Sequence, residues 1–459
     1  MPFDELDEKA QDRRKRIDRA LAVAGGLLKR ASELCGSMIP KREPPLALES
    51  VLPDLALTEN AHGCVRIRRV EIPVFSAGEC VHPRGYVFRP QPDPARLSPS
   101  LDPDLLMALG AMPPPDTPVA LERIAFLDTE TTGLGGPTGT YAFLVGLGYF
   151  RYGVPGEPGT LHFVCEQYFM EDYPHEPALL VHLRQRLSEF EALVTFNGAG
   201  YDIPLLEARA ILNRMRLPLD LPHVDLLWPA RIVYRPTIGS CALASLEANV
   251  LGVVRRHDIE GAFIPQIYFD HLRGRGRERL VPVFDHNVQD IVSLGALILL
   301  FVEMLEDPAH AALQRPENLH GIARLWRSAG RVEHELPFLE SACEYEPSPQ
   351  SHFKLVGDLL RHYRRTGQYA RGVELLRLEC RRAGRHHPEL YTELAKWYEH
   401  RMRDVEAALR VVEEAQAQAD FMLGSGLLDA QAACRWSALL TDLSQRRARL
   451  LRKRQRQGK

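Results

Sequence analysis

The sequence lacks the usual marks of a secreted or membrane-spanning protein, and it has little excess of charge of either sign. Its first residues, MPFDELDEKAQDRRKR, mix charges and contain no apolar signal-peptide core. No run approaches eighteen apolar residues without a charge, so we expect no membrane span. The formal net charge of -3 gives no global signal for nucleic-acid binding, so any such signal must be local.

Closely spaced cysteine pairs are also missing. None of the eight cysteines forms a C-x-x-C pair, and they are far apart: Cys35, Cys64, Cys80, Cys165, Cys241, Cys343, Cys380 and Cys434. This spacing argues against a zinc site and against a disulfide framework. It predicts reduced thiols in a cytoplasmic protein.

The chain has 459 residues, which is too many for one ordinary domain. We expect residues 1–120 to form an N-terminal extension that ends in a proline-rich linker, because nine prolines fall between Pro90 and Pro118. Residues 121–306 have an α/β pattern. Residues 315–440 have a repeating helical pattern, and residues 441–459 form a basic tail.

The α/β segment alternates short apolar runs with helical patterns. RIAFLD, YAFLVGLGYF, LHFVCEQYF and ALVTF are predicted strands, and IPLLEARAIL and HNVQDIVSLGALILLFVEML are predicted helices. Three strands in succession, followed by alternation of strand and helix, predict a mixed sheet with helices packed on it.

The C-terminal third repeats itself. Trp326 precedes Gly330 by four residues, as Tyr363 precedes Gly367, and the two pairs are 37 residues apart. A third unit places Tyr398 a further 35 residues on, but it has Met402 in place of the turn glycine. This period predicts paired helices of the tetratricopeptide kind, which stack to offer a surface for a protein partner or for RNA.

A pair of carboxylates ends the first predicted strand. Asp128 and Glu130 point to one side of a strand, since strand side chains alternate. Two charges a few ångströms apart repel by about 4 kcal/mol at an effective dielectric near 20. A divalent cation would turn that repulsion into binding energy, and oxygen ligands suit magnesium or manganese. The alternative is an exposed strand end with two solvated acids. A D-x-E pair alone is a weak signal, because the chain has two others, at Asp258 and Asp404, and the one at Asp404 lies in a helical repeat as a solvated surface pair.

Two further acids and a histidine lie at other element boundaries. Asp202 opens the helix that follows the strand ALVTF, where an α/β sheet presents functional groups, although a helix cap is the plainer interpretation. His286 and Asp290 are four residues apart, so they share one face of a later helix. An acid at a helix start with a nearby histidine is common, so each part has an ordinary structural explanation.

The combination is more specific than its parts. D-x-E, then Asp after a strand, then His-x-x-x-Asp on a late helix resembles the DEDD group of 3′–5′ exonucleases. FLDTETTGL, LVTFNGAGYDIPLL, LASLEANVLGVVR, IPQIYFD and HNVQDIVSL resemble, in that order, the YprB-type ribonuclease H-like domains. The likeness runs from Phe126 to about Leu300. It implies a ribonuclease H-like mixed sheet flanked by helices and a two-metal phosphodiesterase that acts on DNA or RNA.

The resemblance also implies a role for each residue. Asp128 and Glu130 would hold the Mg²⁺ or Mn²⁺ ion that activates water, and Asp290 would complete that site. Asp128 and Asp202 would hold a second ion. His286 would be the general base. In the histidine subgroup of these exonucleases the base stands five residues before the last aspartate, whereas here the gap is four.

Other residues have weaker patterns. Asp225 could orient a ligand or cap a helix. Arg273, Arg275, Arg277 and Arg279 could contact a phosphate backbone or lie in a solvated loop, and the same alternatives apply to the eight basic residues of the last fourteen. Tyr201 could stack or pack.

Three functions remain open. The leading hypothesis is a metal-dependent 3′–5′ exonuclease that acts on a single-stranded 3′ end of DNA or RNA, with a helical-repeat module behind it. The second is a catalytically idle nucleic-acid-binding or adaptor protein that uses the helical repeats to recruit a partner. The third is a phosphodiesterase that acts on a small nucleotide.

Overall fold

The computed structural model describes nine stretches of the chain, and we discuss structure only within them. They are residues 47–74, 88–89, 97–133, 139–154, 157–255, 258–345, 348–383, 387–425 and 428–457. Most of the predicted N-terminal extension, including part of its proline-rich linker, lies outside the described residues.

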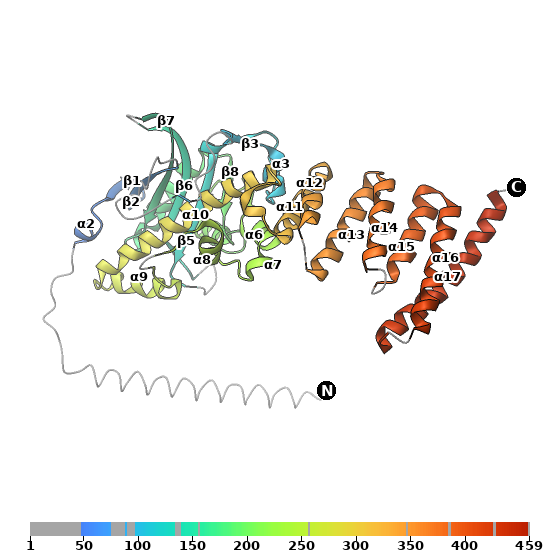
Figure 1. Ribbon diagram of the computed structural model, residues 1–459. Helices are drawn as coiled ribbons and strands as arrows, with labels where there is room; N and C mark the ends of the chain where they lie inside the picture. Colours follow the sequence, from blue (N-terminus) through green and yellow to red (C-terminus); the bar gives the residue numbers. More distant parts are fainter. Residues whose placement is uncertain are drawn as a thin grey trace, which may run out of the picture.

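A seven-stranded mixed sheet is the centre of the N-terminal part (Figure 1). The strand order is β1-β2-β7-β6-β5-β8-β9. β5 pairs with β8 and β8 with β9 in parallel, whereas the other pairs are antiparallel. The strands are β1 Leu55–Asn60, β2 Gly63–Pro73, β5 Ile124–Thr131, β6 Ala142–Val154, β7 Glu157–Phe169, β8 Ala192–Thr195 and β9 His223–Asp225. The mixed sheet flanked by helices that the sequence predicts is confirmed.

The sheet begins earlier than the predicted domain boundary at residue 121. β2 pairs antiparallel with β7 over eight residue pairs and buries Val65, Val70 and Ile72, so it belongs to the sheet. The short helix α2 (Leu48–Val51) precedes the hairpin of β1 and β2. A small ribbon of β3 (Ser100–Leu101) and β4 (Val119–Ala120), with α3 (Pro103–Ala108) between them, leads into β5.

Helices cover both faces of the sheet. One face packs on α4 (Glu176–Leu187) and α5 (Asp202–Leu212), with Ala125 and Leu193 in the shared core. The other face packs on α10 (Leu280–Glu306), with Phe126 and Phe163 beneath it. The remaining elements of this part are η1 Leu121–Arg123, η2 Tyr173–His175, α6 Leu227–Val233, α7 Arg235–Ile238, α8 Leu243–Leu246, the π-turn η3 Glu247–Leu251, η4 Gly261–Phe263, α9 Ile264–Leu272, η5 Arg277–Arg279 and η6 Ala311–Leu313.

Glycines on β6 let α10 lie close to the sheet. A Cβ at Gly146 would be 2.1 Å from Ile291 Cδ1 and 2.3 Å from Asn287 Oδ1. A Cβ at Gly148 would be 2.4 Å from Ile291 Cγ2. Both contacts are far below van der Waals distance, so only glycine permits this approach.

α10 is also the one helix, among the described residues, that is long and apolar enough to cross a membrane. However, 83% of its apolar window is buried inside the protein, as is typical of the core helix of a globular fold. Its composition is therefore explained by packing against the sheet and the neighbouring helices.

The C-terminal part is a row of paired helices that extends away from the sheet (Figure 1). Its first helix, α11, packs on α6. The helices are α11 Pro316–Ser328, α12 Val332–Glu344, α13 Pro349–Arg365, α14 Tyr369–Ala383, α15 Glu389–Trp397 continued by the π-turn η7 Tyr398–Met402, α16 Val405–Gly424 and α17 Ala430–Gln457. The predicted C-terminal helices are confirmed.

The turns between paired helices explain the sequence repeat. Gly330 and Gly367 have φ of 77° and 74°, which favours glycine. In the third unit the left-handed residue is Arg403, with φ of 57°. The π-turn η7 adds one residue to the last turn, so this position falls one residue after Met402.

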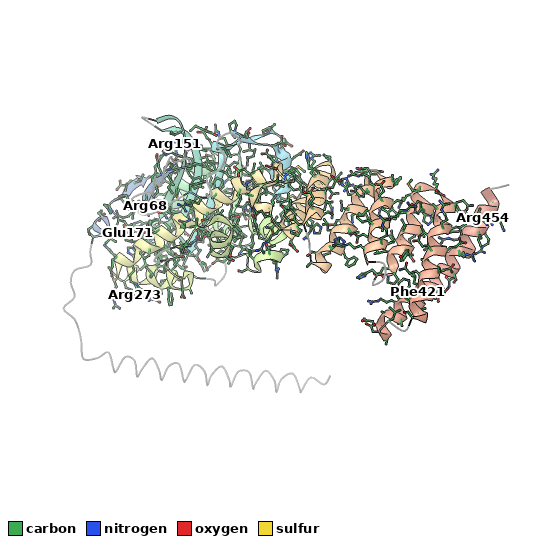
Figure 2. The ribbon with its side chains drawn as sticks, in the orientation of Figure 1. Arg68, Arg151, Glu171, Arg273, Phe421 and Arg454 are labelled. Atoms are coloured by element: carbon green, nitrogen blue, oxygen red, sulfur yellow. The ribbon has the colours of Figure 1, made fainter. Side chains whose placement is uncertain are left out.

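Residues 441–457 do not form a separate tail, since they continue α17, which packs on α16. Their charges are used within the fold: Glu399 is 3% exposed, and Arg449 Nη2 donates to its Oε2 at 2.5 Å. Arg446 and Lys453 approach the same carboxylate at 3.5 and 3.6 Å. Figure 2 shows Arg454 at the far end of the helical row.

Candidate active site

The first acids of the site come from β5. Asp128 and Glu130 lie two residues apart at the end of this strand, and their side chains are only partly accessible, with Glu130 12% exposed. Asn287, on α10, donates from Nδ2 to Asp128 Oδ2 at 2.9 Å. Asn287 is itself held by Gln167, whose amide donates to its Oδ1 at 2.9 Å. The strand end is therefore tied directly to α10.

Asp202 reaches the site from the start of α5. β8 ends at Thr195, and the chain turns through Asn197, which has a φ of 63°, before α5 begins. Asp202 is 6% exposed, and its Oδ1 accepts a hydrogen bond from Thr129 on β5. This contact fixes the acid beside the D-x-E pair.

The last acid and the histidine come from α10. His286 Nε2 lies 3.6 Å from Asp290 Oδ2 and 4.0 Å from Glu130 Oε1. The imidazole therefore lies between a helix acid and a strand acid. The predicted shared face of His286 and Asp290 is observed, and the five predicted residues gather in one place.

Burial raises the pKa values of all four acids, and repulsion from the other acids adds to this for Asp128 and Glu130. Burial raises the pKa of Asp128 well above its ordinary value, and the charges of Asp290, Asp202 and Glu130 add to this. The pKa of Glu130 is raised in the same way, first by burial and then by Asp290 and Asp202. Burial raises the pKa of Asp202 to about 6 even though Thr129 stabilises its charge. Burial also raises the pKa of Asp290, against the opposing charges of His286 and Arg255.

An arginine that the sequence analysis did not select enters this cluster. Arg255 Nη2 donates to Asp290 Oδ1, and its Nε and Nη2 donate to the buried Glu247 at 2.5 and 2.7 Å. Ser293, on α10, donates to the same glutamate at 2.5 Å. Asp290 therefore has one oxygen on an arginine and the other toward His286.

Three other contributors were also missed. Asp258 begins another D-x-E pair of the chain, and its Oδ1 lies 2.7 Å from His286 Nδ1. Asn287 stands next to His286 in HNVQD, and Glu247 lies in LASLEANVLGVVR. The available signal for Asn287 and Glu247 was that they fall inside motifs already selected, whereas Asp258 lies outside every quoted motif.

Several weaker candidates have structural roles. Asp225 accepts from the backbone amides of Asn197, Ala199 and Leu227 at 2.7, 3.2 and 3.1 Å, so it acts as a cap. The hydroxyl of Tyr201 donates to the backbone oxygen of Gly133 at 3.0 Å, and so fastens the chain after β5 to α5.

The loop with the four arginines between residues 273 and 279 lies away from the four acids of the candidate site. Arg273 and Arg279 pair with Asp270 at 3.5 and 3.2 Å. Figure 2 shows Arg273 at the outer end of the globular part, near α9.

The side chains can be compared with what a divalent ion requires. Within the described stretches, no three or more His, Cys, Asp or Glu side chains are already arranged as a metal-binding group. The donor set nevertheless fits a hard cation in kind, because it consists of carboxylate oxygens with one imidazole, and magnesium and manganese prefer such ligands. Repulsion among the acids, seen in their raised pKa values, is what a cation would relieve.

This fold and the gathered acids define the class of the N-terminal part. Residues 125–301 match the model of the RNase_H superfamily, so this part of the chain is a ribonuclease H-like domain, a fold found mostly in hydrolytic nucleases. The chain is similar to the protein described as "Uncharacterized protein YprB" of Bacillus subtilis (strain 168). The two are 29% identical over 308 residues, which are 65% of this chain and 70% of that protein. The resemblance inferred from the sequence motifs is confirmed.

Proposed function

We propose that the protein is a metal-dependent nuclease that removes nucleotides from a single-stranded 3′ end of DNA or RNA. The observation that carries this proposal is the meeting of four acids from β5, α5 and α10 beside one histidine. Ribonuclease H-like domains typically act on nucleic acids with divalent metals, and this supports the same chemistry here.

Asp128, Glu130, Asp202 and Asp290 would hold two Mg²⁺ or Mn²⁺ ions. Bound there, such ions supply positive charge for the attacking and leaving oxygens of a phosphodiester. Asn287 orients Asp128 through the 2.9 Å hydrogen bond, and Thr129 orients Asp202. These contacts hold the carboxylates in place and avoid reorganisation during the reaction.

His286 is the proposed general base. Its Nε2 faces the space between Glu130 and Asp290, where it can take a proton from an attacking water. An imidazole suits this task because its ordinary pKa is near neutrality. The four-residue spacing does not prevent this geometry, since it puts Nε2 within 3.6 Å of Asp290 Oδ2.

One observation favours a second function. Arg255 pairs with Asp290, and a guanidinium can compensate an acid that would otherwise need a metal ion. A nucleic-acid-binding or adaptor protein, with the helical row recruiting a partner, would retain the fold without turnover. The remaining uncompensated acids favour the enzyme.

The test is digestion of 3′-labelled single-stranded RNA and DNA with and without Mn²⁺. We expect short products from the 3′ end only when metal is added, and a loss of at least about 100-fold in rate for Asp128→Ala. Asp270→Ala is the control, because it removes a surface acid outside the cluster. Metal-independent products, or full activity of Asp128→Ala, would contradict the nuclease. Binding without any product would favour the adaptor, and cleavage of dinucleotides alone would favour a small-molecule phosphodiesterase.

A further inference from the structure

His286 has a second contact, on the side of its ring that faces away from the clustered acids. Asp258 Oδ1 lies 2.7 Å from His286 Nδ1. Asp258 is 29% exposed and His286 is 16% exposed, so the contact is partly shielded from water. Asp258 comes from the irregular chain that follows η3, not from the sheet or from α10.

The geometry decides which ring nitrogen carries the proton. An ionised carboxylate can only accept a hydrogen bond, so the 2.7 Å contact requires the proton on Nδ1. Arg255 Nη1 lies 3.2 Å from the same nitrogen, but two donors cannot bond each other. The guanidinium instead donates from Nη1 to Asp258 Oδ2 at 3.2 Å. A neutral ring then keeps its free electron pair on Nε2.

Arg255 anchors Asp258 to the rest of the site. It is 11% exposed and is fastened to Glu247, which has no exposed surface, through two hydrogen bonds. Its third contact, to Asp290, reaches α10 one turn after His286. Through Arg255, Asp258 is therefore connected to α10, the helix that carries His286.

We propose that Asp258 is a positioning residue, which holds His286 as the Nδ1-protonated tautomer and aims Nε2 at the space between Glu130 and Asp290. Its catalytic consequence rests on the proposed nuclease function, but the tautomer itself does not. Asp258 lies behind the imidazole, so it would act through His286 without contacting substrate. A carboxylate in this place orients the ring through its hydrogen bond to Nδ1.

The first experiment measures the tautomer in the full-length metal-free protein. Long-range ¹H–¹⁵N spectra of ¹⁵N-histidine-labelled protein are recorded over a series of rising pH values, up to the pH at which the His286 shifts stop changing. The His286 signals are identified by their loss in His286→Gln. We expect a protonated-type Nδ1 and an unprotonated-type Nε2 in the wild type. In Asp258→Ala, we expect both shifts to move toward a mixture of tautomers.

The second experiment measures turnover on the 3′-labelled substrate with Mn²⁺. We expect kcat of Asp258→Ala to fall by roughly 10- to 100-fold with KM within about twofold of the wild type. The control is Glu389→Gln, because Glu389 lies 3.0 Å from His387 Nδ1 in a comparable pair outside the site. This control should change neither the His286 shifts nor kcat.

The outcomes separate this inference from the proposed function. Unchanged His286 shifts in Asp258→Ala, or changed shifts with wild-type kcat, would overturn the positioning role even in an active nuclease. If the wild type shows no metal-dependent product, the nuclease proposal fails, and the ring shifts alone decide whether Asp258 fixes the tautomer. Should the alanine variant not fold, Asp258→Asn serves instead, since its amide can donate to Nδ1 and move the proton to Nε2.

Discussion

At the scale of single residues, the protonation of the site acids changes the free energy of unfolding of the whole domain. The pKa of Asp202 rises from 3.8 to about 6 on folding, chiefly through burial. The folded protein therefore binds this proton more tightly than the unfolded chain does. The associated stability is fully present below pH 3.8 and is lost as the pH rises through about 6. Above that pH, the metal-free protein contains an ionised Asp202 carboxylate in a buried environment that disfavours its charge.

Asp202→Asn should therefore stabilise the metal-free protein at pH 8. The amide can still accept the hydrogen bond of Thr129, while the buried charge is removed. We expect the free energy of unfolding to rise by on the order of 1 to 3 kcal/mol at pH 8 and to change little at pH 3.5. Urea unfolding at both pH values measures this difference.

The matched control for that substitution is Asp225→Asn. Asp225 accepts three backbone hydrogen bonds, so its amide variant should be less stable at pH 8. A loss of stability in both variants would mean that the charge of Asp202 is well compensated, contrary to our expectation.

The candidate residues could be selected from the sequence where they fall inside a motif. Asp128 near the end of β5, Asp202 at the start of α5 and Asp290 within α10 are of this kind. Arg255 could not be selected, because an ion pair between the chain after η3 and α10 depends on how distant elements pack. The roles of Asp128, Asp202 and Asp290 as metal ligands stay predictions, whereas the structure itself places these acids close together.

At the scale of elements, the distance between α10 and β6 sets the geometry of the site. Asn287, His286 and Asp290 reach β5 only because α10 lies directly on Gly146 and Gly148. The interior is close-packed, so an added methyl group has no free volume to enter. The side chains of Ile291 and Asn287 must then move, and Asn287 is the residue that donates to Asp128.

Gly146→Ala should thus impair both stability and the site. The new Cβ would lie 2.1 Å from Ile291 Cδ1 and 2.3 Å from Asn287 Oδ1, so these two side chains must move. We expect a loss of roughly 1 to 3 kcal/mol by urea unfolding, together with reduced metal-dependent cleavage.

Gly139→Ala is the control for this substitution, since a Cβ there has no heavy atom within 4 Å. Equal stability of Gly146→Ala and Gly139→Ala would show that α10 adapts without cost.

Local patterns predicted β5 and β8 well, because both are apolar runs. They also predicted the apolar part of α10, but not its start at Leu280, six residues before the predicted helix. The membership of β1 and β2 in the sheet was not predicted. β2 pairs with β7 about a hundred residues away, for example Val70 with Cys165, and no local pattern contains such a pairing.

At the scale of the whole molecule, the helical row and the sheet share one hydrophobic core. Val233 on α6, Leu305 on α10 and Ile322 on α11 belong to the same buried cluster. Trp326 Nε1 also donates to the backbone oxygen of Leu305 at 3.2 Å. The repeat period could be predicted from Trp326 and Tyr363, because turns recur locally. The packing of α11 on α6 could not be predicted, because the first repeat contains the same types of residue as the later repeats.

This shared core predicts that the two parts unfold together at their junction. Gly321, on α11, is the sharpest probe, since a Cβ there would lie 2.7 Å from Val233 Cα and 3.0 Å from Ile232 O. Backbone atoms cannot rotate away, so Gly321→Ala must separate α11 from α6. Hydrogen exchange should show lower protection in both helices, with a loss of roughly 1 to 3 kcal/mol in global stability.

Gly357→Ala provides the opposite expectation for the same chemical change. Gly357 lies within α13, and a Cβ there has no heavy atom within 4 Å. Alanine should raise stability by up to about 1 kcal/mol, because it is the better helix former. If Gly321→Ala lowered protection in α11 while α6 kept its own, the helical row would be an independent domain resting on the nuclease fold. Loss in both helices would instead show that α6 and α11 unfold together.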